Sequence, residues 1–209
     1  MILIGGMPTL VQPARHFDRT DLRILDAMRD LAAANGTKVT IDQVTASAEV
    51  SRATIFRRFG SRDSLFDQMF QREVRLGIDA IVARAASVSS PVDRAVELIV
   101  ATFEVCVSHP VIRFLAVNEP ANLVHFGTSG EPSPLEVVRR TFADMIRLAL
   151  AERPESRVRG VLPADTIADV LVHMIAGYTM VPNNGTEPQF PEHLRAASAE
   201  VARRLLAVD

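Results

Sequence analysis

The segment from Ser51 to Arg62 contains four arginines and no acidic residue, although the whole chain has a formal net charge of −2. These arginines are Arg52, Arg57, Arg58 and Arg62. A guanidinium group can pair in bidentate fashion with phosphate oxygens or with the acceptor edge of guanine. An isolated run of arginines is more often a solvated helix face than a binding surface. The elements that carry the run therefore decide between these two interpretations.

The residues before and within this segment predict two short helices joined by a tight turn. Thr40 and Ser51 each precede a helical pattern, and a hydroxyl there can cap the helix by accepting a hydrogen bond from a free backbone N–H. Apolar residues follow at helical spacing, namely Ile41, Val44 and Ala48 in the first helix and Ile55 and Phe59 in the second. The apolar side holds the two helices together. The arginine side is left for a partner, and the N-terminal end of the helix adds a positive dipole and free N–H groups.

The segment from Thr40 to Leu65, preceded by a helix over about residues 20–35, resembles the N-terminal DNA-binding domain of the tetracycline-repressor-like (TetR) family of bacterial transcription regulators. That family has a Thr at the start of its second helix, an Ala-Gly-Val-Ser turn, an aromatic-x-x-Phe run, and a Lys or Arg that opens its fourth helix. The same positions here are Thr40, Ala48-Glu49-Val50-Ser51, Phe56-Arg57-Arg58-Phe59 and Arg62-Asp63-Ser64-Leu65. The resemblance covers about the first third of the chain. Beyond it, only length and helical character agree.

The resemblance implies that the second helix of the pair enters the DNA major groove. It implies DNA contacts by Thr40, Ser51, Arg52, Ala53, Thr54, Phe56, Arg57, Arg58 and Arg62. Two of the family positions differ. Glu49 stands where the family has Gly, and a left-handed backbone there costs about 1 kcal/mol more with a Cβ than with Gly. Phe56 stands where the family most often has Tyr, so it lacks the hydroxyl that would donate to a phosphate.

Length and composition agree with a small DNA-reading head on a larger helical body. The chain has 209 residues, of which 48% are hydrophobic, and this is enough for such a core. We expect an all-α fold with a disordered arm over residues 1–18, a three-helix helix-turn-helix DNA-binding domain over residues 19–66, and a helical ligand-binding and dimerisation domain over residues 67–209. The single cysteine, Cys106, excludes an intramolecular disulfide and favours the reducing cytoplasm. We expect neither a signal peptide nor a membrane-spanning segment, because no apolar run is long enough.

Hydrophobic spacing and helix breakers predict nine helices in all, which is also the usual count in the resembled family. They cover about residues 20–35, 40–48, 51–59, 62–87, 92–108, 111–118, 135–151, 163–178 and 191–208. The polar stretch from His125 to Pro134 predicts a mobile loop, and no segment has a convincing strand pattern. The last two helices are apolar enough to be buried in a monomer core or against a second copy. In the resembled family these helices form the dimer interface, and we expect the same here.

The predicted middle helices carry aromatic, sulfur-containing and polar residues where the resembled family has its ligand cavity. We expect an unknown small amphipathic effector to contact some of these residues, namely Phe103, Cys106, His109, Phe114, Asn118, His125, Met145, His173, Met174 and Tyr178. Each of them is also an ordinary core residue by type. We expect no metal site, because His109 and His173 lie far apart with no Cys or carboxylate at ligand spacing. No cofactor is predicted.

These observations leave three hypotheses about function. The leading one is a dimeric, sequence-specific DNA-binding transcriptional regulator, a repressor that a small-molecule ligand releases from a palindromic operator by changing the spacing of its two heads. The second is a helical small-molecule-binding protein whose head has lost DNA affinity, which Glu49 and Phe56 suggest. The third, an enzyme, has the least support, because the chain lacks the common catalytic and phosphate-binding motifs and Cys106 lies in an apolar run that disfavours its thiolate.

Overall fold

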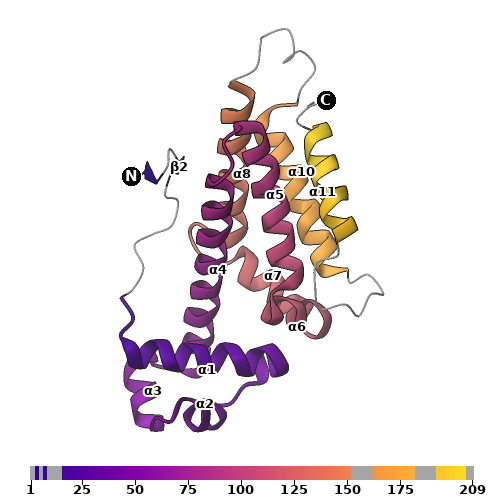
Figure 1. Cartoon of the computed structure of the whole chain (residues 1–209). Helices are drawn as coiled ribbons and strands as arrows, with labels where there is room; N and C mark the ends of the chain where they lie inside the picture. Colours follow the sequence, from indigo (N-terminus) through magenta and orange to yellow (C-terminus); the bar gives the residue numbers. More distant parts are fainter. Residues whose placement is uncertain (1–2, 5–6, 9–15, 152–161, 182–191, 206–209) are drawn as a thin grey trace.

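The computed structural model describes residues 3–4, 7–8, 16–151, 162–181 and 192–205 (Figure 1). Within these residues the chain forms ten α-helices, which are α1 (Arg19–Asn35), α2 (Ile41–Ala48), α3 (Arg52–Phe59), α4 (Arg62–Ala86), α5 (Pro91–Ser108), α6 (Pro110–Asn118), α7 (Pro120–Thr128), α8 (Pro134–Ala151), α10 (Ala164–Met180) and α11 (Glu192–Leu205). A 3-10 turn, η1 (Gly36–Lys38), joins α1 to α2. The predicted all-α fold is confirmed.

The helices divide into a small head, made of α1 to α3 with η1, and a larger body, made of α5 to α11. Figure 1 shows α4 rising from the head along the side of the body. The helices α5, α8, α10 and α11 stand side by side, and α6 and α7 lie at the end of the body that faces the head. Because α6 packs directly on α1, the head contacts the body through more than α4.

Side-chain caps and prolines determine where the helices begin. The side chains of Asp18, Thr40, Ser51 and Ser61 accept hydrogen bonds from backbone N–H groups in the first turns of α1 to α4. The helices α5, α6, α7 and α8 each begin with a proline. A proline is favourable there because its missing N–H would have no partner in the first turn. The predicted caps at Thr40 and Ser51 are confirmed.

The hydrophobic core of the head includes residues from the body. Its buried side chains come from α1 to α4, and Val111 and Leu115 of α6 are buried in the same cluster. Leu123 and Phe126 of α7 pack against it. The core of the head therefore extends beyond residue 66, where the sequence predicts that the head ends. The division into domains stays a prediction.

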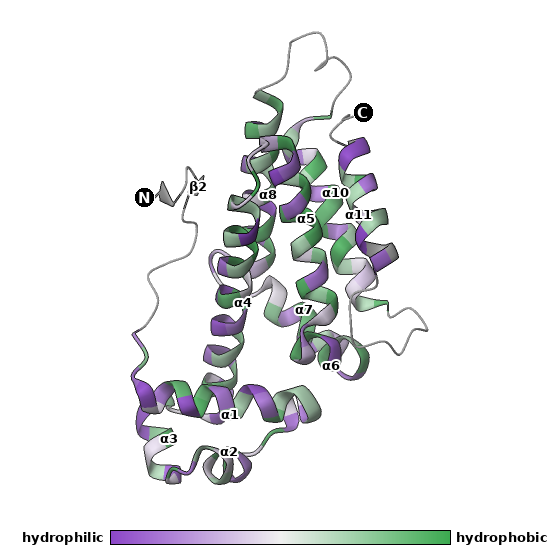
Figure 2. Ribbon diagram, in the orientation of Figure 1, coloured by the Kyte–Doolittle hydropathy of each residue, from purple (hydrophilic) through white to green (hydrophobic). Residues whose placement is uncertain are grey.

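The core of the body is centred on α5, which contributes fully buried side chains such as Leu98 and Ile99. The long apolar sides of α5 and α10 are visible in Figure 2. Two arginines, Arg84 of α4 and Arg195 of α11, form ion pairs with Glu97 and Glu104 of α5. These pairs join three helices at the surface of the core.

The structure corrects two expectations about secondary structure. The chain is helical from Pro120 to Thr128, so α7 was missed and only residues 129–133 remain of the predicted loop that began at His125. The sequence pattern hid this helix because Pro120 stops one helix and starts the next, and because α7 has no buried residue. The chain also contains one short antiparallel pair of strands, β1 (Leu3–Ile4) and β2 (Met7–Pro8), where no strand was predicted. The predicted end of the last helix, residues 206–208, lies outside the described residues.

Across the described residues, no single helix has both the length and the apolar character needed to cross a membrane. The helices α5 and α6 satisfy the length and composition criteria only as a pair, with a bend of 63° between them. Both helices contribute buried residues to the cores described above.

Candidate nucleic-acid interface

The helices α2 and α3 pack against each other and against α1 through a small apolar surface. Ile55 and Phe59 of α3 are buried, as are Val44 and Ala48 of α2. Glu49 ends α2 in the left-handed region, with φ 52° and ψ 48°. In this conformation a residue with a Cβ is strained relative to glycine.

The opposite side of α3 is exposed and carries Ala53, Phe56 and two arginines. The side chain of Arg52 is 66% exposed and forms an ion pair with Asp42 of α2. Arg57 is exposed, and no described residue forms an ion pair or a hydrogen bond with its side chain. Phe56 is 47% exposed. An exposed cation and an exposed ring therefore stand on the face that points away from the head's core.

Arg58 differs from its neighbours because it turns back onto the start of α1. Its Nη1 donates to Oδ2 of Asp18 at 2.6 Å and to Oδ1 of Asp21 at 2.9 Å. The hydrogen bond from Arg58 lowers the pKa of Asp18. Asp21 is buried, so Arg58 compensates a carboxylate that has little access to water. Arg58 thus joins α3 to α1.

Arg62 also interacts with the head itself. Its Nη1 donates to the carbonyl oxygen of Thr37 and, at 3.4 Å, to that of Val39, and its guanidinium pairs with Asp63. These carbonyls lie in and just after η1. Arg62 therefore fixes the start of α4 to the turn between α1 and α2.

The hydroxyl groups of the predicted site are all near the starts of α2 and α3. Thr40 accepts from the backbone N–H of Gln43 at 3.3 Å, and Ser51 accepts from that of Thr54 at 3.1 Å. The hydroxyls of Ser51 and Thr54 lie 2.9 Å apart. Thr40 and Ser51 are exposed and Thr54 is half-buried.

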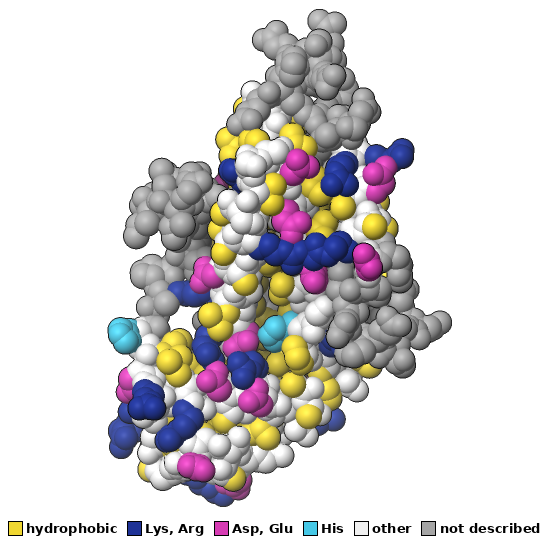
Figure 3. All heavy atoms as spheres, in the orientation of Figure 1, with side chains coloured by type: hydrophobic (Ala, Val, Ile, Leu, Met, Phe, Trp, Pro, Cys, Tyr) yellow, Lys and Arg dark blue, Asp and Glu magenta, His cyan; other side chains and the backbone are white. Residues whose placement is uncertain are grey.

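Figure 3 shows basic and acidic side chains interspersed over the head. The surface of the head is therefore not uniformly positive.

The nine predicted DNA-contact residues thus divide by their surroundings. Arg52, Ala53, Phe56 and Arg57 are presented to solvent by α3, and Thr40, Ser51 and Thr54 stand at helix starts. Arg58 and Arg62 form ion pairs and hydrogen bonds with other residues of the head. The part of each residue in DNA binding stays a prediction.

The predicted ligand residues of the body divide between the body core and other parts of the chain. Phe103 and Tyr178 stack edge to face with ring centroids 4.8 Å apart, and Met145 is buried in the same core. Asn118 and His173 are exposed, and His173 pairs with Asp169 of its own helix. Met174 packs against the body core. Two others lie elsewhere: Phe114 lies beside Gly36 at the junction with the head, and His109 faces Glu73 of α4. Their role as ligand contacts stays a prediction.

Cys106 is packed against the body core. Burial raises the pKa of its thiol to about 11. The thiol is therefore protonated at neutral pH and is a poor nucleophile. Among the described residues there is no group of three His, Cys, Asp or Glu side chains that could hold a metal ion.

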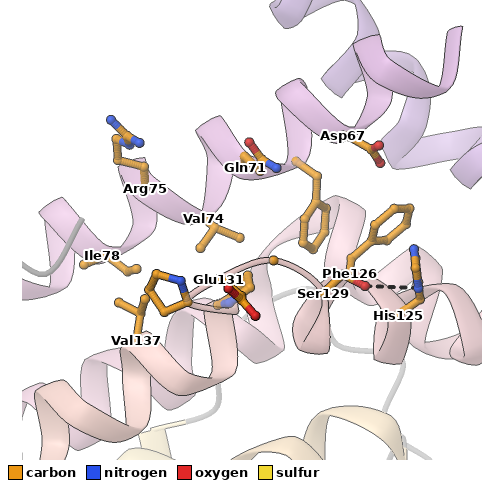
Figure 4. A pocket seen from close by; sticks show the side chains of 14 residues that line it. Asp67, Gln71, Val74, Arg75, Ile78, His125, Phe126, Ser129, Glu131 and Val137 are labelled. Atoms are coloured by element: carbon orange, nitrogen blue, oxygen red, sulfur yellow. Dashed lines mark hydrogen bonds between the residues drawn. The ribbon is translucent and has the colours of Figure 1, made fainter. Parts of the chain in front are cut away.

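A cleft of about 300 Å³ lies between α4 and the segment from the end of α7 to the start of α8. Figure 4 shows Val74 and Ile78 of α4 facing Phe126 and Val137 across it, with Gln71, Ser129 and Glu131 at its edges and Arg75 turned away. Phe70 also lines the cleft, and its ring centroid lies 4.9 Å from that of Phe126. An apolar floor with a polar rim suits a small amphipathic molecule.

Asp67 and His125 form one end of this cleft. Burial raises the pKa of Asp67, and the negative charge of Asp63 raises it further. The nearby His125 lowers this pKa, but by less. His125 interacts with Ser129 through Nδ1 at 3.1 Å. Of the lining residues, only His125 was among the sequence candidates. The others were missed because the cleft depends on α7, which the sequence pattern concealed.

Residues 24–69 match the family model of bacterial regulatory proteins of the tetR family. This segment contains most of α1, all of α2 and α3, and the start of α4. A search of curated proteins finds no significant match.

Solved structures with the same fold cover nearly the whole chain. The fatty acid degradation regulator FadR from Bacillus halodurans has a TM-score of 0.62 at 15% identity, with 92% of this chain and 97% of that chain covered. The TetR-family regulator CifR, in complex with a 26-base-pair operator DNA, has a TM-score of 0.59 at 17% identity, with 94% and 98% covered. AibR, in complex with isovaleryl coenzyme A and operator DNA, has a TM-score of 0.57 at 13% identity, with 91% and 100% covered.

Proposed function

We propose that the chain is a DNA-binding transcriptional regulator of the tetR family, and that it acts as a homodimeric repressor that a small molecule releases from a palindromic operator. The exposed face of α3 carries this proposal. A short helix that holds its apolar side in the head's core and presents Arg52 and Arg57 outward suits the major groove.

In this proposal the contacts of α3 differ in kind along the helix. Arg52 and Thr54 stand near its N-terminal end, where side chains reach base edges and the helix dipole favours phosphate. Arg57 binds a backbone phosphate, and the exposed ring of Phe56 packs against the sugar–phosphate backbone without donating a hydrogen bond. Arg58 and Arg62 act indirectly by holding α3 and η1 in place.

Two copies of the chain associate through the two C-terminal helices, α10 and α11, which carry the exposed valines Val170 and Val201. Large apolar residues are exposed on α8, just before α10, on α10 and just after it, and Leu148, Leu162, Val170 and Val181 are 40%, 51%, 48% and 70% exposed. Large exposed apolar side chains along a helix favour a protein interface there. A two-fold dimer would place its heads about 34–36 Å apart on successive major grooves. CifR and AibR provide examples of this fold in complex with operator DNA.

The small molecule binds in the cleft between α4 and α7. Its apolar part lies against Phe70, Val74 and Phe126, and its polar part faces the rim near Gln71 and Ser129. Because α4 leads directly into the head, an occupant that shifts α4 changes the separation of the two heads. AibR, which has the same fold, is solved with a coenzyme A thioester and DNA together. We place the protein in the cytoplasm, where a DNA-binding regulator acts.

Fluorescence anisotropy with the DNA upstream of its own coding sequence tests the DNA-reading part of the proposal. The logarithm of the binding constant should fall linearly with the logarithm of the salt concentration. Arg57→Gln should weaken binding and make this slope less negative by about 2 per dimer, because one phosphate contact is lost in each half. Arg140→Gln, at an exposed arginine of α8 in the body, is the matched control. Wild-type protein that binds no DNA at low salt would favour the carrier hypothesis instead.

Binding of Nile red, an uncharged amphipathic dye, tests the cleft. Val74→Trp should fill the cleft and abolish the increase in dye fluorescence. Leu76→Trp, which places the same ring on a side chain that is 47% exposed on α4, should leave dye binding unchanged. Equal dye binding by both variants would exclude the cleft as the ligand site.

Sedimentation of Val170→Glu tests the interface. A charge at this exposed apolar position of α10 should turn the dimer into a monomer without unfolding it. A variant that stays dimeric would place the interface elsewhere.

A further inference from the structure

The turn between α1 and α2 is held from two sides, by α4 and by the body. Arg62 of α4 donates to the carbonyl oxygen of Thr37. On the other side, the Thr37 backbone N–H donates to the carboxylate of Glu119, with distances of 3.3 Å to Oε1 and 3.2 Å to Oε2. The Thr37 hydroxyl donates to Oε2 of Glu119 at 2.5 Å. One residue of the head is thus fixed through all three of its polar groups.

Asn122 completes this contact from the first turn of α7. Its Nδ2 donates to Oε2 of Glu119 at 2.8 Å and lies 3.3 Å from the hydroxyl of Thr37. Burial of Glu119 disfavours its charged form, but the hydrogen bonds from Thr37 and Asn122 outweigh this effect and lower its pKa. The carboxylate is therefore ionised at neutral pH, and its hydrogen bonds are of the strong, charge-assisted kind. We call these three residues, Thr37, Glu119 and Asn122, the junction triad.

The backbone at Gly36 allows the body to approach this closely. Gly36 is buried with φ 56°, in a region that favours glycine. A Cβ at this position would lie under 3.0 Å from the carboxylate of Glu119 and from the ring of Phe114. The head and the body are therefore fitted to each other at η1, in addition to being joined by α4.

The helix α7 connects the junction triad to the cleft. Glu119 immediately precedes α7 and Asn122 lies in its first turn, whereas His125 and Phe126 near its other end line the cleft. At 1.5 Å per residue, this helix is only about 13 Å long, so it moves as one rod. An occupant that displaces Phe126 would move Glu119 relative to η1.

We propose that Glu119 is a positioning residue for DNA reading, which fixes the turn before α2 to the body and couples the orientation of the head to occupancy of the cleft at the other end of α7. This inference rests on the proposed function for its consequence in DNA binding. The junction triad itself exists in the free protein and can be measured there. With the triad intact, the two heads of a dimer are held in register before they meet DNA. With the triad open, the head keeps its contacts with α4 and α6 but loses the anchor at η1, and ordering η1 again opposes DNA binding.

Hydrogen exchange of the Thr37 amide, followed by NMR on the full chain, tests the triad directly. In wild-type protein this amide should be protected. Glu119→Ala should accelerate its exchange by at least about tenfold, and Glu119→Gln should have a smaller effect because the amide oxygen still accepts one bond. Asp93→Asn, which removes an exposed carboxylate at the start of α5, is the control and should change nothing.

Two further measurements are the DNA affinity of Glu119→Ala and the exchange of the Thr37 amide in the cleft variants. Glu119→Ala should weaken DNA binding about three- to thirtyfold with an unchanged salt slope, because Glu119 contacts no phosphate. Val74→Trp, which imitates an occupant, should also expose the Thr37 amide, and Leu76→Trp should not.

The outcomes distinguish this inference from the proposed function. The Thr37 amide could be protected in wild type and exchange faster in Glu119→Ala and Val74→Trp, while the protein binds no DNA. That result would overturn the proposed function but support the coupling between the cleft and the junction triad. Salt-dependent DNA binding that is the same in wild type and Glu119→Ala would overturn the positioning role. If Val74→Trp leaves the Thr37 amide protected, the coupling to the cleft is wrong.

Discussion

Leu115 lies in α6 of the body, but its fully buried side chain belongs to the core of the head. Leu115→Ala should therefore destabilise the head although residue 115 lies outside the segment that matches the family model. Replacing a fully buried leucine by alanine typically costs about 2–5 kcal/mol, because transfer energy is lost and a cavity remains. A loss of about 3 kcal/mol corresponds to roughly a hundredfold increase in the population of the open head.

Hydrogen exchange read by mass spectrometry measures where this loss occurs. Peptides from α1 should exchange roughly a hundredfold faster in Leu115→Ala, whereas peptides from α8 and α10 should change little. Leu98→Ala is the matched control, because Leu98 is equally buried but lies in the body core. It should accelerate exchange in α5 and α8 and spare α1. If Leu115→Ala loosens only the body and leaves α1 protected, the conclusion that α6 completes the head's core is wrong.

Three further predictions follow from single side chains. Arg58→Gln should weaken DNA binding without changing the salt slope, since Arg58 pairs with Asp18 and Asp21 rather than with phosphate; a slope change as large as that of Arg57→Gln in the same anisotropy assay would contradict this. Cys106 should react slowly with a thiol reagent at pH 7 and faster as pH rises toward its pKa of about 11, because only the thiolate reacts; rapid absorbance change at pH 7 in folded protein would refute its burial. Glu49→Gly should raise the free energy of unfolding by up to about 1 kcal/mol in urea titrations, because Glu49 has φ 52°; a clear loss of stability would show that Glu49 makes a compensating contact.

The sequence was most informative where local rules act alone. Thr40 and Ser51 identify the starts of α2 and α3 because a hydroxyl cap and the apolar spacing after it are both local properties. In contrast, α7 was hidden because Pro120 acts as both a stop and a start, and because the helix buries none of its residues.

The side-chain interactions of the candidate site depended on distant parts of the chain. Arg58 was predicted to face DNA, but its partners Asp18 and Asp21 lie some forty residues earlier, with separations of 40 and 37 residues. Glu119 reaches Thr37 across 82 residues. Spacing within one helix cannot show such pairings, because they are set by how the helices pack. The cleft was missed for the same reason, since α7 forms one of its walls.

A structure of the protein bound to a palindromic DNA, selected from a random pool, tests the central claim most directly. We expect two chains related by a two-fold axis, with α3 of each in successive major grooves, Arg57 against a phosphate, and Arg58 still paired with Asp18 and Asp21. A complex in which α3 lies outside the groove, or in which a single chain binds through another surface, would contradict it.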